Sequence, residues 1–199
     1  MKSSIEDRFD QNIARVKNLL NIYAAHLAGS GPGRRSPLKT DVLRAAVVFL
    51  HASLEDLLRS LAYWKLPHAN SCVLSDIPLV SANPAKKFTL GQLADHRGQT
   101  VEDVIGVSVK SYLERSNYNN TDDIATLLGN IGVQVANVNS YFSQLDDLMS
   151  RRHQIVHRAD GDETGGSGNH RVRSIGPTQL NSWVSTVKSF GHAVLNEVT

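Results

Sequence analysis

The stretch KTDVLRAAVVFLHASLEDLLRSLAYWK, residues 39–65, carries the pattern that decides the fold class. It contains neither glycine nor proline and is rich in alanine and leucine, the residues that most favour an α-helix. Its helical stripe, spaced by three and four positions, consists of Val42, Ala46, Phe49, Ser53, Leu57 and Leu61. The stretch therefore predicts a long helix with one buried side.

Helical spacing also dominates most of the remaining chain. A second stripe, near the N-terminus, consists of Ile5, Phe9, Ile13, Val16, Leu20, Tyr23 and Leu27. We expect further helices over 100–116 with Thr100 as N-cap, over 121–130, over 133–157, and from Pro177 onward. The sequence therefore predicts an all-α fold.

Proline and glycine divide this helical pattern. Prolines interrupt residues 66–88, so this stretch is expected to be a long connection. We assign residues 1–199 to a single domain, a helical bundle, with residues 66–133 as a loop or helical insertion or connecting region between its early and late helices.

Charge and cysteine content limit the functions that the chain can have. The net charge of +2 means that binding to nucleic acid would need a local basic patch. The single cysteine, Cys72, cannot form an internal disulfide and suits a reducing compartment. The N-terminus lacks the apolar core of a signal peptide, and the run AAVVFL is too short to span a bilayer. We therefore expect a cytoplasmic protein without a membrane contact.

The stretch MSRRHQIVHRADGDE, residues 149–163, concentrates basic side chains near the predicted end of a helix. Such residues often gather there to complement the helix dipole, which is the simplest interpretation. The nearby glycine-rich stretches GSGPGRR and GGSGNHR lack the GK[ST] ending of a phosphate-binding P-loop and are expected to be linkers. A chemical role for the cluster therefore depends on its arginines and histidines.

His153 and His157 are four positions apart, the spacing of zinc-binding histidines in H-E-x-x-H metallopeptidases. In the stretch HQIVH, Gln154 replaces the glutamate that would act as general base, and an amide cannot accept that proton. The sequence marks no third ligand. Zinc hydrolysis stays an alternative that this pattern does not favour, and we expect no metal and no cofactor.

Arg152 occupies a position where the apolar stripe of its helix predicts an aliphatic residue. A guanidinium group can hold two phosphate oxygens, and histidine exchanges protons near pH 7, so Arg152 and His157 could cut a phosphodiester bond. On an ideal helix, however, residues five apart diverge by roughly 140°. Either the helix end is distorted, or a second copy of the chain completes the site across a two-fold axis.

The stretch RRHQIVHR resembles the R-x4-6-H motif of HEPN domains, which are helical domains named for higher eukaryotes and prokaryotes nucleotide-binding. Arg152 and His157 match this motif, and the polar His153 follows the arginine. The stretches HRAD and FLHASLEDLLRSLA, the latter with Glu55, are similar to the RiboL-PSP-HEPN branch of the family. The resemblance covers the chain from about residue 40 to its end.

The resemblance implies a homodimeric, metal-independent endoribonuclease of toxin–antitoxin or other defence systems, acting on RNA under a possible antitoxin or regulatory protein. It makes Arg152 the phosphate-binding residue, His157 the general acid or base, and His153 a residue that tunes proton transfer. Residues expected to support the site or contact RNA are Glu55, Arg151, Arg158, Asp160 and Arg171. From the residues alone, a surface pair between Glu55 and Arg59 is an equal alternative for that glutamate. A non-catalytic nucleotide-binding or protein-interaction module is the alternative function.

Overall fold

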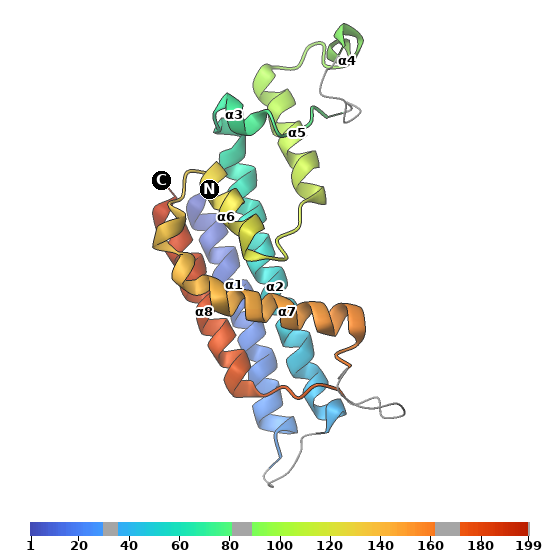
Figure 1. The fold of residues 1–199 in the computed structure, drawn as a ribbon, viewed down its shortest axis with the longest axis vertical. Coiled ribbons are helices and arrows are strands. Elements are labelled where there is room, and N and C mark those ends of the chain that lie inside the picture. Colours follow the sequence, from blue (N-terminus) through green and yellow to red (C-terminus); the bar gives the residue numbers. More distant parts are fainter. Residues whose placement is uncertain (30–35, 81–88, 162–171, 199) are drawn as a thin grey trace.

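The computed structural model describes residues 1–29, 36–80, 89–161 and 172–198. Within these ranges it contains no regular strand, which confirms the predicted all-α fold (Figure 1). The helices are α1 (Lys2–Ile22), α2 (Pro37–Lys65), α3 (Ser71–Leu74), α4 (Leu90–Ala94), α5 (Val101–Arg115), α6 (Thr121–Asn130), α7 (Phe142–Arg158) and α8 (Pro177–Glu197). A π-helical turn, Tyr23–Leu27, continues α1, and the 3-10 turn Leu66–His68 follows α2.

The helix α2 is the centre of the bundle. It packs against α1, α5, α7 and α8, and α1 and α8 also pack against each other. Most of its aliphatic side chains are buried, namely Leu43, Ala46, Val47, Leu50, Leu54, Leu57, Leu58, Leu61 and Ala62. The stripe predicted for α2 was therefore too narrow, because neighbouring helices cover this helix from several sides. The predicted stripe of α1 is confirmed, with all its members buried or partly buried.

One glycine allows three helices to approach closely. Gly191 of α8 faces α1 and α2, and a Cβ atom there would lie 2.4 Å from Cε1 of Phe9 and 2.9 Å from Cδ2 of Leu57. Contacts this short do not occur between side chains, so any larger residue would push these helices apart. Gly191 thus sets the spacing at the centre of the core.

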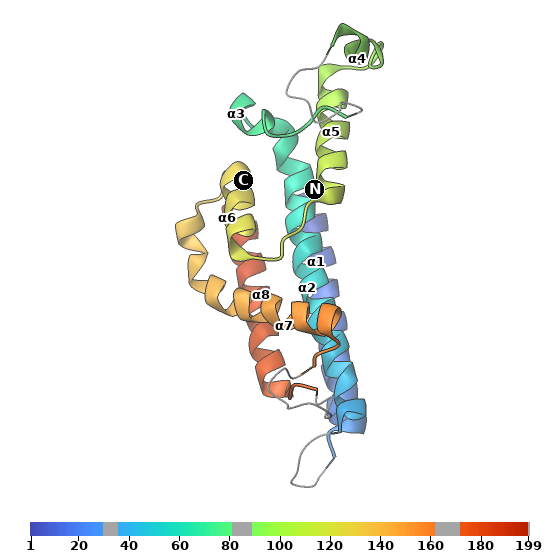
Figure 2. The same cartoon turned by 45° about the vertical axis from the view of Figure 1, so that its right-hand side comes forward.

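The helix α7 runs across the long axes of α1, α2 and α8 (Figures 1 and 2). It begins at Phe142, whereas the sequence predicted a helix from residue 133. Two 3-10 turns, Val135–Asn137 and Asn139–Tyr141, precede it. Residues 133–141 are rich in asparagine and valine, which are weak helix formers. This segment therefore forms short 3-10 turns, and the regular α-helix begins only after it.

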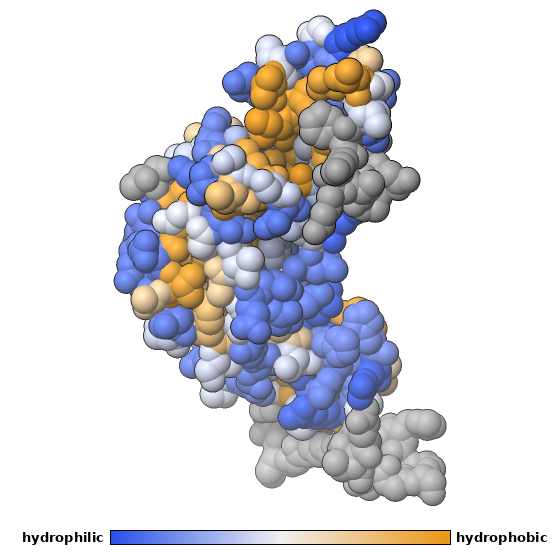
Figure 3. Space-filling view, turned by 45° about the horizontal axis from the view of Figure 1, so that its top comes forward, coloured by the Kyte–Doolittle hydropathy of each residue, from blue (hydrophilic) through white to orange (hydrophobic). Residues whose placement is uncertain are grey.

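Helices α3, α4 and α5 lie toward the end of the bundle where the two termini are found, and α5 packs against α2 (Figure 2), whereas α6 packs against α7. Thr100 caps α5 as predicted, with its side chain accepting a hydrogen bond from the backbone N–H of Asp103. Apolar side chains gather on this part of the surface (Figure 3). Leu90 of α4 and Val101 and Val107 of α5 are exposed.

Candidate functional site

The basic cluster lies in the last two turns of α7 and consists of Arg151, Arg152, His153, His157 and Arg158. The helix ends in a left-handed turn. Ala159 and Asp160 have φ angles of 47° and 58°, a conformation that non-glycine residues rarely adopt. The backbone N–H of Asp160 donates to the carbonyl oxygen of Gln154 at 3.0 Å, which closes the helix end. This turn directs the Asp160 side chain back into the protein.

Asp160 is buried between two arginines. Its Oδ2 accepts hydrogen bonds from Nε of Arg44 at 2.7 Å and from Nη2 of Arg151 at 2.8 Å. Only 1% of Asp160 and 6% of Arg151 are exposed. Burial lowers the pKa of the Arg151 guanidinium, while the negative charge of Asp160 opposes that shift. The Arg44–Asp160–Arg151 triad therefore joins the start of α2 to the end of α7.

The same arginines hold the segment that leads into α8. Nη2 of Arg44 donates to the carbonyl oxygen of Arg173 at 2.9 Å, and Nη2 of Arg151 donates to that of Ser174 at 3.1 Å. The backbone N–H of Arg173 donates to the carbonyl oxygen of Asp160 at 2.8 Å. Arg151 and Asp160, both predicted to support the site or contact RNA, are thus buried and hold the end of α7 against the segment before α8.

Arg152 lies on the side of α7 that faces α2. It is half-buried, and its Nε is buried without a hydrogen-bond partner, as is Nε2 of His51 on α2. Burial lowers the pKa of His51 below its usual 6.5, the Glu55 carboxylate raises it, and the positive charge of Arg152 lowers it further. The prediction that Arg152 continues the inward-facing stripe of α7 therefore agrees with its position.

Glu55, His51 and Arg152 form an inner cluster between α2 and α7. Its Oε2 lies 3.8 Å from Nδ1 of His51, and its Oε1 accepts a hydrogen bond from the backbone N–H of Tyr118 at 3.5 Å. Arg59 instead donates to the carbonyl oxygen of Ser116 at 3.0 Å. The alternative of a surface Glu55–Arg59 pair is therefore wrong, and Glu55 faces the interior beside His51.

His153 and His157 lie on the exposed side of α7. Their ring centroids are 4.6 Å apart, as expected for residues one helical turn apart. The helix is continuous to Arg158, so the end is not distorted and Arg152 and His157 diverge as on an ideal helix. One chain alone therefore does not direct Arg152 and His157 at the same point.

A cavity of about 340 Å³ opens beside this end of α7. It is lined by Asn119, Met149, Ser150, Arg152, His153, Gln154 and Arg158. Asn119 comes from the loop between α5 and α6 and was not predicted as a site residue, because nothing in its local sequence distinguishes it. The cavity combines cations, two amide side chains and a histidine, groups suited to an anion with hydrogen-bonding substituents.

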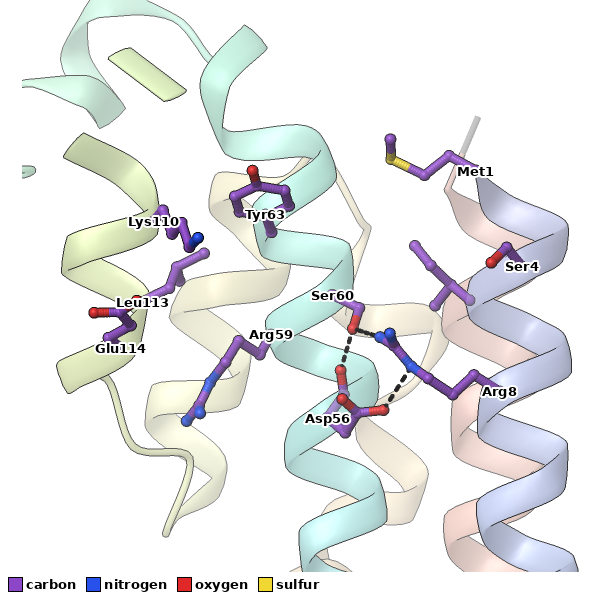
Figure 4. A pocket seen from close by; sticks show the side chains of 11 residues that line it. Met1, Ser4, Arg8, Asp56, Arg59, Ser60, Tyr63, Lys110, Leu113 and Glu114 are labelled. Carbon is purple, nitrogen blue, oxygen red and sulfur yellow. Dashed lines mark hydrogen bonds and ion pairs between the residues drawn. The ribbon is translucent and has the colours of Figure 1, made fainter. Parts of the chain in front are cut away.

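A larger cavity, of about 720 Å³, lies between α1, α2 and α5 (Figure 4). Nε of Arg8 pairs with Oδ2 of Asp56 at 2.9 Å across it, and Arg8 also donates to the hydroxyl of Ser60. No residue of α7 lines this cavity. It is therefore separate from the basic cluster.

Within the described ranges, no three side chains of histidine, cysteine, aspartate or glutamate are arranged to hold a metal ion. Gln154, the residue in place of a metallopeptidase glutamate, accepts a hydrogen bond from Nη1 of Arg173 at 2.9 Å. Arg171, predicted to contact RNA, lies outside the described residues. None of the described helices is long and apolar enough to cross a membrane.

The sequence model of the RiboL-PSP-HEPN family matches residues 10–199, which include α2, the inner cluster and the whole of α7. The chain belongs to this family. Membership makes this HEPN domain a ribonuclease-like or nucleotide-binding module, and HEPN domains bind RNA and often dimerise. No curated protein and no solved structure matches the chain.

Proposed function

We propose that this HEPN domain is a metal-independent endoribonuclease that acts in the cytoplasm, in a defence or toxin–antitoxin setting. The observation that carries the proposal is the position of Arg152, whose side chain lines a cavity on α7 together with His153. A guanidinium in such a cavity can bind a phosphodiester through two oxygens. An antitoxin or another regulatory protein would restrain the activity.

The chemistry assigns one task to each basic side chain. Arg152 binds the scissile phosphate and stabilises the charge that develops on it. His157 takes part in transfer of the proton from the ribose 2′-OH, whose oxygen forms a new bond to phosphorus. The bond from phosphorus to the 5′-oxygen breaks and that oxygen takes up a proton, so the products are a 2′,3′-cyclic phosphate and a 5′-OH end. His153, next to His157, tunes this transfer.

The proposed enzyme is a homodimer with sites shared between its chains. Arg152 lies on the inner side of α7, and His157 on its exposed side, so one straight helix does not bring both to one phosphate. A two-fold axis that pairs two α7 ends would place the His157 of each chain near the Arg152 of its partner. The catalytic pair would then come from two chains.

The different directions of Arg152 and His157 on one helix also support one other function. If the chains do not pair in this way, Arg152 and His153 could still bind a nucleotide, without a histidine placed for proton transfer. The domain would then be a non-catalytic nucleotide-binding or protein-interaction module. RNA binding without cleavage would distinguish this function from the enzyme.

The deciding experiment incubates purified protein with a mixed RNA panel in excess EDTA and maps the product ends. We expect cleavage with 2′,3′-cyclic phosphate ends, lost in His157→Ala and Arg152→Ala. His26→Ala serves as a matched control, because His26 is exposed on the turn after α1, away from the cluster. Absence of cleavage by the folded dimer, or cleavage that persists in both variants, would refute the proposed enzyme.

A further inference from the structure

The loop between α5 and α6, residues 116–120, is held in place by the bundle at alternate residues. The carbonyl oxygen of Ser116 accepts a hydrogen bond from Arg59, and the side chain of Asn120 caps α6 by accepting from the backbone N–H of Asp123 at 2.8 Å. Between them, the Tyr118 side chain is buried, and this burial raises its pKa to about 12. The loop is thus a fixed part of the cavity wall.

Asn119 is the residue of this loop that faces the Arg152 cavity. The backbone is extended at both ends of the loop, at Ser116 and at Asn120. Tyr118 points into the core, and Asn119 is exposed and lines the cavity with Arg152 and His153. Within the described residues its amide makes no hydrogen bond, so both its donor and its acceptor are available.

We propose that Asn119 recognises the nucleobase beside the phosphate bound by Arg152, with a preference for adenine. The inference deepens the proposed function, since it concerns the RNA bound at the same site. The cavity volume of about 340 Å³ lies at the lower end of the range for small-molecule sites. A site of this size suits a single nucleotide. On the edge that carries N7 in purines, adenine alone offers one donor and one acceptor to an asparagine amide, whereas guanine offers two acceptors, uracil an acceptor and cytosine a donor. Unstacked RNA bases present this edge to proteins.

The test measures binding rather than cleavage. Fluorescence anisotropy in EDTA gives the affinities of short single-stranded oligo(A), oligo(C) and oligo(U) for the His157→Ala protein, which cannot degrade them by the proposed reaction. We expect oligo(A) to bind at least about fivefold more tightly than the other two, the lower end for a bidentate amide–base contact. Adding Asn119→Ala should abolish this preference and leave the binding of oligo(C) and oligo(U) nearly unchanged.

Asn117→Ala is the matched control, because Asn117 is an exposed asparagine of the same loop and lines a different cavity. It should retain the preference for oligo(A). Equal affinities in the parent protein, no binding of any oligonucleotide, or a preference that survives Asn119→Ala would overturn the inference. The outcome does not depend on catalysis, so a protein that fails to cleave RNA refutes the proposed function while Asn119 is still tested.

Discussion

Asp160 and Arg44 are 116 residues apart in the chain, yet Oδ2 of Asp160 lies 2.7 Å from Nε of Arg44 in the interior. Arg151 shares the same carboxylate oxygen. The contact fixes the end of α7 against the start of α2. His157 lies only three positions before Asp160, so the triad also determines where the proposed catalytic histidine is held.

Replacing Asp160 by asparagine should strongly destabilise the protein. The substitution preserves shape but removes the buried negative charge between Arg44 and Arg151, and the remaining ion pair of Arg44 is with an exposed carboxylate. We expect a loss of about 3–5 kcal/mol in the free energy of unfolding. Asp41→Asn is the matched control, because the exposed Asp41 also contacts Arg44, at 3.2 Å, and should cost at most about 1 kcal/mol. Urea unfolding measures both, and equal stabilities of the two variants would contradict a structural role for the triad.

Gly191→Ala should destabilise the core by about 1–3 kcal/mol, since the added methyl group overlaps the ring of Phe9. Gly106→Ala is the control: Gly106 also lies in a helix, α5, but a Cβ atom added there would meet no neighbouring side chain within 4 Å. Alanine favours a helix more than glycine does, so this variant should be as stable as wild type or more stable. Thermal unfolding compares them, and a neutral Gly191→Ala would show that the helices can separate at little cost.

His51 should make the protein less stable in acid. Its pKa in the folded state is lowered by burial, so the unfolded chain binds more protons as the pH falls below about 6.5. The free energy of unfolding should therefore decrease from about pH 7.5 to about pH 5.5. His51→Gln should reduce this dependence, whereas His26→Gln, at an exposed histidine, should leave it unchanged. Urea titrations at both pH values test this, and identical slopes for all three proteins would exclude His51 as the cause.

Mixing two inactive variants should restore activity if the site is shared between chains. A heterodimer of Arg152→Ala and His157→Ala chains has one site with both wild-type residues and one with neither. After random exchange of subunits, roughly a quarter of the wild-type cleavage rate is expected. If each site used Arg152 and His157 of one chain, the mixture would stay inactive. Size-exclusion chromatography with light scattering verifies that dimers are present.

The sequence alone determined the fold class and the central motif. Apolar spacing is a local property, so it located α1, α2, α5, α6 and α8 well, and it gave the divergence of Arg152 and His157 from helix geometry alone. The same reasoning extended α7 too far toward its N-terminus. Local spacing does not show where weak helix formers give way to turns.

The tertiary structure decided which basic side chains are inside and which are accessible. Arg151 and Arg158 are alike in sequence, yet Arg151 is buried against Asp160 and Arg158 is exposed. That difference depends on Arg44, which pairs with Asp160. The wall of the Arg152 cavity depends on Asn119. Both residues come to α7 from other parts of the chain. The energy of a buried charge depends on such partners, and packing between helices brings them together where no local pattern records it.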